Sequence, residues 1–168
     1  MADVAIARQK RHLRNGKISR EEQILGVSEA LFDEVFLGGG ASEIAPFTDT
    51  FLYDLKAMSE KTHLALTGRD NGEILDNLRY LDAIGARVEV RIPFAPALNG
   101  GEIEKIARFL GTLSCVCAVR VLPYHAGAAS KYGALGMKYA VSALPPTEEE
   151  LLLAEETVRR LSGIPCRR

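Results

Sequence analysis

Strand-like and helix-like segments alternate along most of this 168-residue chain, and this order constrains the fold more than any other feature. Runs of β-branched and aromatic residues that are closed by Pro or Gly predict strands. Amphipathic stretches that end at Gly predict the helices between them. The predicted strands cover about 49–54, 88–92 and 116–122, and the predicted helices cover about 59–66, 71–84, 101–111 and 148–161.

A repeated strand–helix–strand order predicts right-handed crossovers, and therefore a parallel sheet in an α/β fold. Three strands are few for a parallel sheet, which usually has more strands and has helices on its faces. The pattern therefore predicts part of a barrel or part of a doubly wound sheet. Residues 126–146 are rich in Gly, Ala and Pro, which suits a loop that lies over a site.

The formal net charge of −1 gives no electrostatic reason to expect a nucleic-acid or membrane partner. The apolar runs are strand-sized, so we expect no segment that spans a bilayer. The odd cysteine count, with Cys115, Cys117 and Cys166, fits a reducing compartment and predicts a cytoplasmic protein. Cys115 and Cys117 would share one face of a strand and could begin a metal site. Because no third ligand follows at a suitable spacing, we favour two structural thiols.

The first 45 residues differ in character from residues 46–165, and we treat them as a separate, divergent segment. The first 20 residues carry six basic residues and a single acid, which suits a solvated tail better than a transit peptide. The sequence Ser19-Arg20-Glu21-Glu22 predicts a capping box that opens a helix to about Phe36. Gly38-Gly39-Gly40 lacks the spacing and the trailing Lys of a phosphate loop, so we predict a flexible joint.

Polar residues follow or close each of the three predicted strands. Asp54 and Lys56 stand at the end of the first, Arg91 lies near the end of the second, and Tyr124 and His125 follow the third. Because strand side chains alternate, Asp54 and Lys56 should project from the same face. The carboxyl ends of parallel strands are where α/β proteins bind ligands, so these side chains should meet in one cleft.

An acid, two cations and an imidazole suit a small ligand that carries both a carboxylate and an amine. Asp54 could accept from an ammonium group or bind a cation, while Lys56 and Arg91 could hold a carboxylate. His125 could donate to a ribose hydroxyl or act as an acid or base. Each residue alone has a plainer alternative: an exposed ion pair, a surface strand residue or a loop histidine with satisfied hydrogen bonds.

Two polar residues outside the strand ends receive structural interpretations. We expect His63 to be a surface residue of the short helix at 59–66. We expect Asn71 to cap the next helix, and a ligand contact from Asn71 is the less favoured alternative.

Several short motifs occur in a fixed order, and together they resemble one family. From about residue 46 to 165, the chain resembles the C-terminal half of glycyl-radical enzyme activating enzymes of the pyruvate formate-lyase type, which are members of the radical S-adenosylmethionine superfamily. The motifs that carry this resemblance are Thr48–Lys56, Leu66-Thr67-Gly68 with Asn71, Asn77-Leu78, Val90–Pro93, Leu122–His125, Lys131-Tyr132, Leu135-Gly136 and Pro145-Pro146.

The resemblance implies half of a partial (β/α)6 TIM-like barrel, with three parallel strands in this chain. It implies S-adenosylmethionine and a [4Fe-4S] cluster as cofactors, and a glycyl-radical enzyme such as pyruvate formate-lyase as partner. In that family a 5′-deoxyadenosyl radical abstracts hydrogen from a glycine of the partner. By resemblance, Asp54 and Lys56 contact the methionine end of the cofactor, and Arg91 and His125 line the same site. Asp54 would also hold a monovalent cation, with the backbone carbonyl of Leu52 beside it.

Two motifs of the family are missing from this sequence. The Cys-x-x-x-Cys-x-x-Cys motif that binds the cluster is absent, and so is the Gly-Gly-Glu-Pro motif that grips the amino group of S-adenosylmethionine. The three cysteines present have the wrong spacing to replace the cluster ligands, so no iron–sulfur ligand is assigned. The resemblance therefore implies a truncated or split activating enzyme that is inactive alone.

Alternatives remain open at this point. A separate chain that carries the cluster could complete the enzyme. The chain could instead be a non-catalytic binding module or relic that keeps only cofactor or partner docking, or an unrelated α/β domain that binds another anion. As a half-barrel, it should expose an unpaired edge at its first strand, and should therefore aggregate or pair with a partner.

Overall fold

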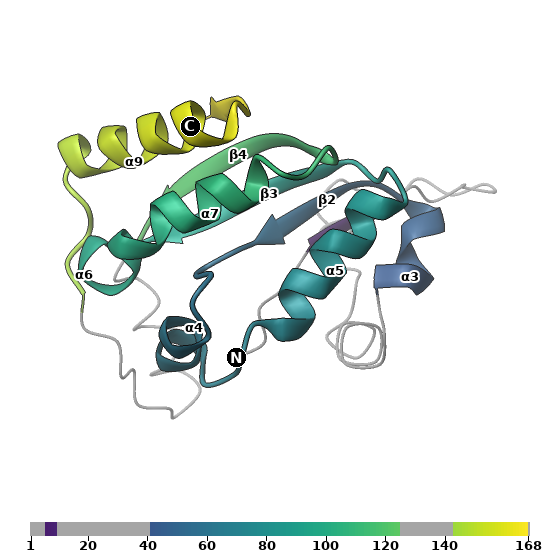
Figure 1. Cartoon of the computed structure of the whole chain (residues 1–168), viewed down its shortest axis with the longest axis horizontal. Helices are drawn as coiled ribbons and strands as arrows, with labels where there is room; N and C mark the ends of the chain where they lie inside the picture. Colours follow the sequence, from purple (N-terminus) through teal and green to yellow (C-terminus); the bar gives the residue numbers. More distant parts are fainter. Residues whose placement is uncertain (1–5, 10–40, 125–142, 168) are drawn as a thin grey trace, which may run out of the picture.

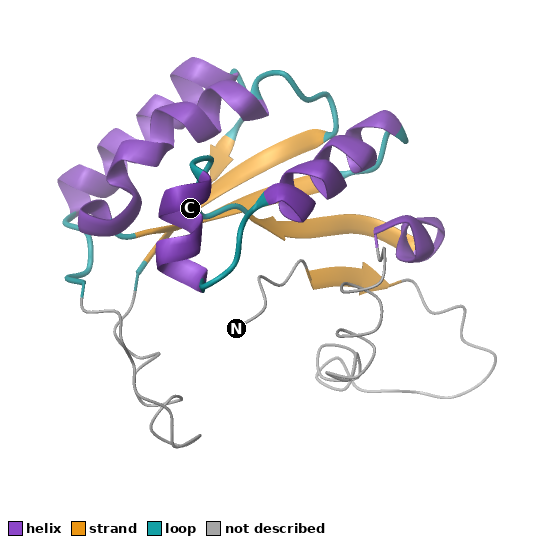
Figure 2. Ribbon diagram, turned by 60° about the horizontal axis from the view of Figure 1, so that its bottom comes forward, coloured by secondary structure: helices purple, strands orange, loops and turns teal. Residues whose placement is uncertain are grey.

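The computed structural model describes residues 6–9, 41–124 and 143–167. They form a five-stranded sheet in the order β1-β2-β3-β4-β5, with helices along one side (Figures 1 and 2). The strands are β1 (Ile6–Gln9), β2 (Thr48–Asp54), β3 (Val88–Phe94), β4 (Val116–Pro123) and β5 (Cys166–Arg167). The helices are α3 (Ala41–Ile44), α4 (Glu60–Thr67), α5 (Gly72–Ala83), α6 (Pro96–Asn99), α7 (Ile103–Leu110) and α9 (Glu148–Ser162), with 3-10 turns at Ala45–Phe47 and Gly100–Glu102.

The predicted α/β fold with parallel strands is confirmed. Strands β2 to β5 run parallel, and the three predicted strands and four predicted helices all appear within a few residues of their expected bounds. Short β5 adds a fourth parallel strand that the sequence did not predict. The predicted helix to Phe36, the glycine joint and most of the 126–146 loop lie outside the described residues. Of the predicted basic tail, only Ile6–Gln9 are described, and they form strand β1 rather than a free tail.

The expected unpaired edge at the first predicted strand is wrong for most of its length. Strand β1 pairs antiparallel with β2, from Ile6 opposite Leu52 to Gln9 opposite Thr48. The backbone groups of β2 on this side are therefore partnered within the chain itself. Whether the chain aggregates or pairs with a partner stays a prediction.

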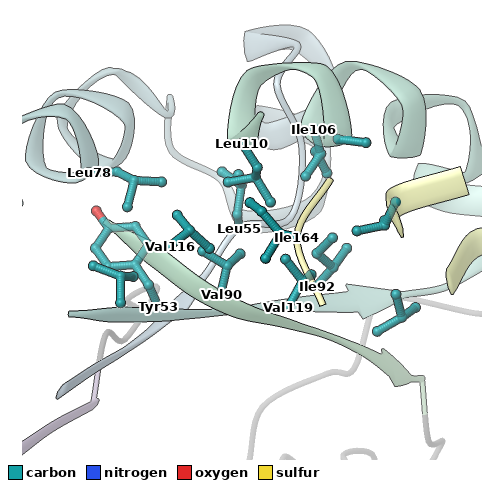
Figure 3. Packing of buried hydrophobic residues seen from close by; sticks show 14 of the residues in the cluster. Tyr53, Leu55, Leu78, Val90, Ile92, Ile106, Leu110, Val116, Val119 and Ile164 are labelled. Atoms are coloured by element: carbon teal, nitrogen blue, oxygen red, sulfur yellow. The ribbon is translucent and has the colours of Figure 1, made fainter. Parts of the chain in front are cut away.

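Side chains that alternate along the strands separate a packed face from an open one. On the packed face, the helices α5, α7 and α9 cover a core that is almost fully buried (Figure 3). This alternation follows from the two-residue period of a strand. The buried side chains drawn between sheet and helices include Tyr53, Leu55, Leu78, Val90, Ile92, Ile106, Leu110, Val116 and Val119.

A bulge in β4 decides which of its residues share the open face. Val88 stands opposite Val116, but Glu89 stands opposite Ala118, because Cys117 is an extra residue in the pairing. Beyond the bulge, Arg91 stands opposite Arg120. A one-residue shift exchanges the two faces of a strand, so the bulge places Arg120 rather than Val119 beside Arg91.

The ends of the helices follow the predicted signals in one case and differ in another. The capping box of α9 is confirmed: Thr147 N donates to Glu150 Oε2 at 2.8 Å, and Glu150 N donates to Thr147 Oγ1 at 3.2 Å. Asn71, predicted to cap α5, makes no capping bond with its side chain. Asp70 takes that place, since its Oδ1 accepts from Gly72 N at 2.9 Å.

Candidate functional site

Asp54 and Arg91 meet on the open face of the sheet. They are direct partners in the register of β2 and β3. Arg91 Nε donates to Asp54 Oδ1 at 2.7 Å, and Arg91 Nη2 lies 2.6 Å from the same oxygen. Their side chains are only 19% and 20% exposed, so the pair is largely shielded from water. Asp54 Oδ2 accepts no hydrogen bond from the residues that the structure describes.

Lys56 follows Asp54 on the same side of the chain. Burial alternates along this segment: Asp54 and Lys56 are half-buried, whereas Leu55 and Ala57 are fully buried. This is the alternation that was predicted. Leu55 N donates to Arg91 O at 2.9 Å, so the pairing with β3 continues past the end of β2. The structure thus brings together Asp54 at the carboxyl end of β2, Lys56 just beyond it, and Arg91. Arg91 lies in the middle of β3 rather than near its end as predicted, because β3 continues to Phe94.

The partial burial of this cluster changes its protonation. Burial lowers the pKa of Lys56 to about 8, and the positive charge of Arg91 adds to this effect. Burial also raises the pKa of Asp54, although the charge and hydrogen bond of Arg91 oppose the rise. Partial burial thus disfavours the charged form of both groups, and an oppositely charged ligand group beside either of them would favour that form.

A second ion pair on the open face was not predicted from the sequence. Arg120 Nε donates to Glu89 Oε1, which joins β4 to β3 beside the first pair. Glu89 stands opposite Ala118 and Arg120 stands opposite Arg91, so the ion pair runs diagonally between the strands. The bulge at Cys117 sets this register. Only the pairing of the strands could reveal this contact.

The loop after β2 is held by buried polar side chains that the sequence reasoning also missed. Asn99 Nδ2 donates to Lys56 O at 2.9 Å. Asn71 Nδ2 donates to Ala57 O at 3.0 Å and to Met58 O at 2.9 Å. An Asn in a turn is a weak signal for such a role, because a buried amide requires hydrogen-bond partners but an exposed one fits the same sequence.

His63 is buried rather than on the surface, so its predicted exposure is wrong. Its side chain is 1% exposed, and its Nδ1 lies 2.9 Å from Arg69 O and 3.2 Å from Thr67 Oγ1. These bonds tie the end of α4 to the turn that follows. The helical period alone gave no sign of this, because it shows which residues share a face of the helix but not what covers that face.

The third strand end is described only to Tyr124, whose backbone N donates to Phe94 O at 2.9 Å. His125, predicted to line the site, lies outside the described residues. Within the described part of the chain, no group of three or more His, Cys, Asp or Glu residues is arranged to hold a metal ion. No helix described here is long and apolar enough to cross a membrane.

The three cysteines are free thiols in separate positions. Cys115 is buried, and this burial raises the pKa of its thiol to about 12, with a smaller contribution from the nearby carboxylate of Asp82. Burial also raises the pKa of Cys166. A buried thiol with a raised pKa is unreactive, which suits a structural role for Cys115. Cys117, the other thiol of the predicted pair, is half-buried, and its structural role stays a prediction.

Comparison with curated proteins finds relatives of one kind. The trans-4-hydroxy-L-proline dehydratase activating enzyme of Clostridioides difficile is 37% identical over 123 residues, which are 70% of this chain and 39% of that protein. The isethionate sulfite-lyase activating enzyme of Nitratidesulfovibrio vulgaris is 33% identical over 121 residues, and covers 71% of this chain and 37% of its own length. The chain is a distant homologue of the glycyl-radical enzyme activating enzymes.

Two further findings set the extent of this homology. The pyruvate formate-lyase-activating enzyme of Listeria monocytogenes is 31% identical over 118 residues, which are 69% of this chain and 48% of the relative. The chain thus spans less than half the length of these three relatives. A crystal structure of a domain of pyruvate-formate lyase-activating enzyme from Bacteroides vulgatus shares the fold, with a TM-score of 0.63, 22% identity, and coverage of 77% of this chain and 73% of that one. No family model matches the chain.

Proposed function

We propose that this chain binds the methionine end of S-adenosylmethionine as one part of a glycyl-radical enzyme activating enzyme. The family uses this cofactor and a [4Fe-4S] cluster to act on glycyl-radical enzymes such as pyruvate formate-lyase. When bound, S-adenosylmethionine is the source of the radical that removes hydrogen from a glycine of the partner. The observation that carries the proposal is that Asp54 and Lys56, at the end of β2 and just beyond it, lie beside Arg91 on the neighbouring strand β3.

The charges of this cluster suit the two ends of an amino acid. Asp54 Oδ1 is engaged by Arg91, which leaves Oδ2 to accept from a ligand ammonium or to bind a monovalent cation. Lys56 and the outer nitrogens of Arg91 can donate to a carboxylate. A ligand carboxylate beside Lys56 would favour its charged form and would raise its pKa from about 8. By resemblance His125 belongs to the same site.

The residues of this chain do not fit the [4Fe-4S] cluster of the family. The sequence lacks the three-cysteine motif, and Cys115, Cys117 and Cys166 are separate free thiols. In an activating enzyme that includes this chain, the ligands of the [4Fe-4S] cluster would be residues other than those of this sequence. The role proposed for this chain is to bind and orient the cofactor, and no redox step is assigned to its own residues.

Calorimetry with S-adenosylmethionine tests the site directly. Asp54→Ala should weaken binding about tenfold or more, as expected when a charge-assisted hydrogen bond is lost. Asp76→Ala is the matched control, because Asp76 is an exposed acid on α5 that pairs with neighbouring Arg79. Equal affinity of wild type and Asp54→Ala, or no binding by the wild type, would overturn the proposal.

The missing cysteine motif supports a second candidate, a non-catalytic binding module that is similar in fold but takes part in no radical reaction. Anaerobic incubation with iron and sulfide, followed by electron paramagnetic resonance, tests for an iron–sulfur cluster, and the addition of a cluster-bearing chain separates the two candidates. Neither predicts a cluster signal from this chain alone. Added cluster-bearing chain should restore cofactor cleavage if the chain is an enzyme part, and should leave cleavage absent if it is a binding module.

A further inference from the structure

The backbone that carries Lys56 is fixed by side chains rather than by regular secondary structure. We call residues 56–59, between the end of β2 and the start of α4, the post-β2 loop. Three of its carbonyl groups accept hydrogen bonds from the side chains of Asn99 and Asn71. Two of its N–H groups, those of Met58 and Ser59, donate to Glu102 Oε2 at 3.0 and 2.8 Å.

These three side chains come from elements distant in the sequence and are almost completely buried. Asn71, Asn99 and Glu102 are 4%, 3% and 4% exposed. A buried carboxylate is unfavourable unless it is hydrogen-bonded, and Glu102 also accepts from Lys105 Nζ at 2.8 Å. Burial works to raise the pKa of Glu102, but the bonds from Lys105, Ser59 and Met58 outweigh it and hold the pKa below its ordinary value. The carboxylate is therefore present as an anion when it holds the loop.

Asn99 also sets the distance between the two strand ends that form the candidate site. Besides Lys56 O, its Nδ2 donates to Pro93 O at 2.7 Å, and its Oδ1 accepts from Ala95 N at 2.9 Å. One amide thus joins the backbone after β2 to the backbone at the end of β3. Any movement of Asn99 would change the position of Lys56 relative to Arg91.

We propose that Asn71, Asn99 and Glu102 are positioning residues that hold the post-β2 loop so that Lys56 points toward the carboxylate-binding side of the Asp54–Arg91 cluster. The inference rests on the proposed function, since it assigns these residues to the recognition of one group of the same ligand. A loop that is already ordered needs no ordering when the ligand binds, and a small misplacement of a contacting group weakens binding strongly.

A purely structural role is the competing explanation. Met58 and Ser59 precede α4, and Ser59, the N-cap residue, makes no capping bond with its own side chain. On this explanation, the whole role of Glu102 is to accept hydrogen bonds from the N–H groups where that helix begins. A structural role would affect the stability of the protein, but it would not affect the ability to distinguish ligands with and without a carboxylate.

The test compares S-adenosylmethionine with its decarboxylated form, which keeps the amine and the nucleoside. For each variant, calorimetry gives the dissociation constant of the decarboxylated form divided by that of S-adenosylmethionine. This ratio is large when the protein recognises the carboxylate. Glu102→Ala should lower this ratio about tenfold, because Lys56 no longer meets the carboxylate. Glu102→Gln keeps an oxygen that can accept from both N–H groups, and should keep most of the ratio. Glu104→Ala, which removes an exposed acid on α7, is the control and should leave the ratio unchanged.

Hydrogen–deuterium exchange at Met58 and Ser59 provides a second measurement, and both amides should exchange faster in Glu102→Ala. If that variant does not fold, Asn99→Asp serves instead, since it keeps the acceptor for Ala95 N but loses both donated bonds. An unchanged ratio in folded Glu102→Ala or Asn99→Asp overturns this inference while the proposed function stands. A wild type that binds S-adenosylmethionine no better than the decarboxylated form overturns the inference as well. A wild type that binds neither ligand overturns both.

Discussion

The Asp54–Arg91 pair allows a quantitative prediction about the site before any ligand is considered. Exposed ion pairs typically contribute about 0.2–1 kcal/mol, whereas removal of one partner of a fully buried pair costs about 3–5 kcal/mol. This pair lies between the two limits, with each side chain about one-fifth exposed and two guanidinium nitrogens within 2.7 Å of one oxygen. We expect a coupling energy of about 1–3 kcal/mol.

A double-mutant cycle measures this energy. The free energy of unfolding is obtained by urea denaturation for wild type, Asp54→Ala, Arg91→Ala and the double variant. The matched control is the Glu104–Arg108 pair, whose atoms are 3.9 Å apart and whose side chains are 64% and 66% exposed. That pair should show a coupling of about 0.3–0.5 kcal/mol, as is usual for an exposed pair one helical turn apart.

High salt distinguishes the coupling energies of the two ion pairs further. At about 1 M NaCl, exposed charges are screened within about 3 Å, while a largely buried pair is screened much less. The Asp54–Arg91 coupling should therefore persist in high salt, and the Glu104–Arg108 coupling should disappear. A coupling at Asp54–Arg91 no larger than that of the control, or one abolished by salt, would refute the shielded geometry on which the site depends.

Three further predictions concern the surroundings of the site. Tyr53→Phe should lower stability by about 1 kcal/mol in thermal unfolding, because the hydroxyl donates to Ile74 O at 2.6 Å, while Tyr80→Phe on the exposed side of α5 should have no effect. Cys115 should resist maleimide labelling at pH 8 until urea unfolds the protein, since burial raises its pKa to about 12. Rapid labelling of Cys115 itself in the native protein, with the labelled residue identified by peptide mapping, would contradict its burial. The folded-state pKa of Glu102 is lowered, so its stabilising effect is present at neutral pH and is lost as the pH falls below about 4.5 through the folded pKa. Glu102→Gln should remove this part of the acid-induced loss of stability measured by denaturation between about pH 2 and 5, and identical pH profiles would argue against it.

The sequence predicted the relative positions of Asp54 and Lys56 better than the positions of the residues that surround them. Asp54 and Lys56 share a face because a strand has a two-residue period, and this needs no knowledge of the rest of the fold. The approach of Arg91 to Asp54 required in addition that the two strands be parallel neighbours in the register that sets these residues opposite each other. What these side chains bind remains a prediction.

The residues that position the site could not be found in the same way. Asn99 and Glu102 act on a backbone more than 40 residues away, and each fits its local sequence equally well as an exposed polar residue. The burial of His63 was mispredicted for the same reason, since a helical period shows which residues share a face but not what covers them. Partners of buried polar groups are set by packing across the chain.

The sequence alone therefore determined the alternating strands and helices, the parallel sheet and the polar strand ends, because these follow from local periodicity and chain direction. Only the tertiary structure decided the edge pairing of β1, the two-residue strand β5 and the bulge at Cys117 that brings Arg120 beside Arg91. Such features are too short to have a period of their own. They exist because backbone groups of distant segments must find hydrogen-bond partners in the assembled sheet.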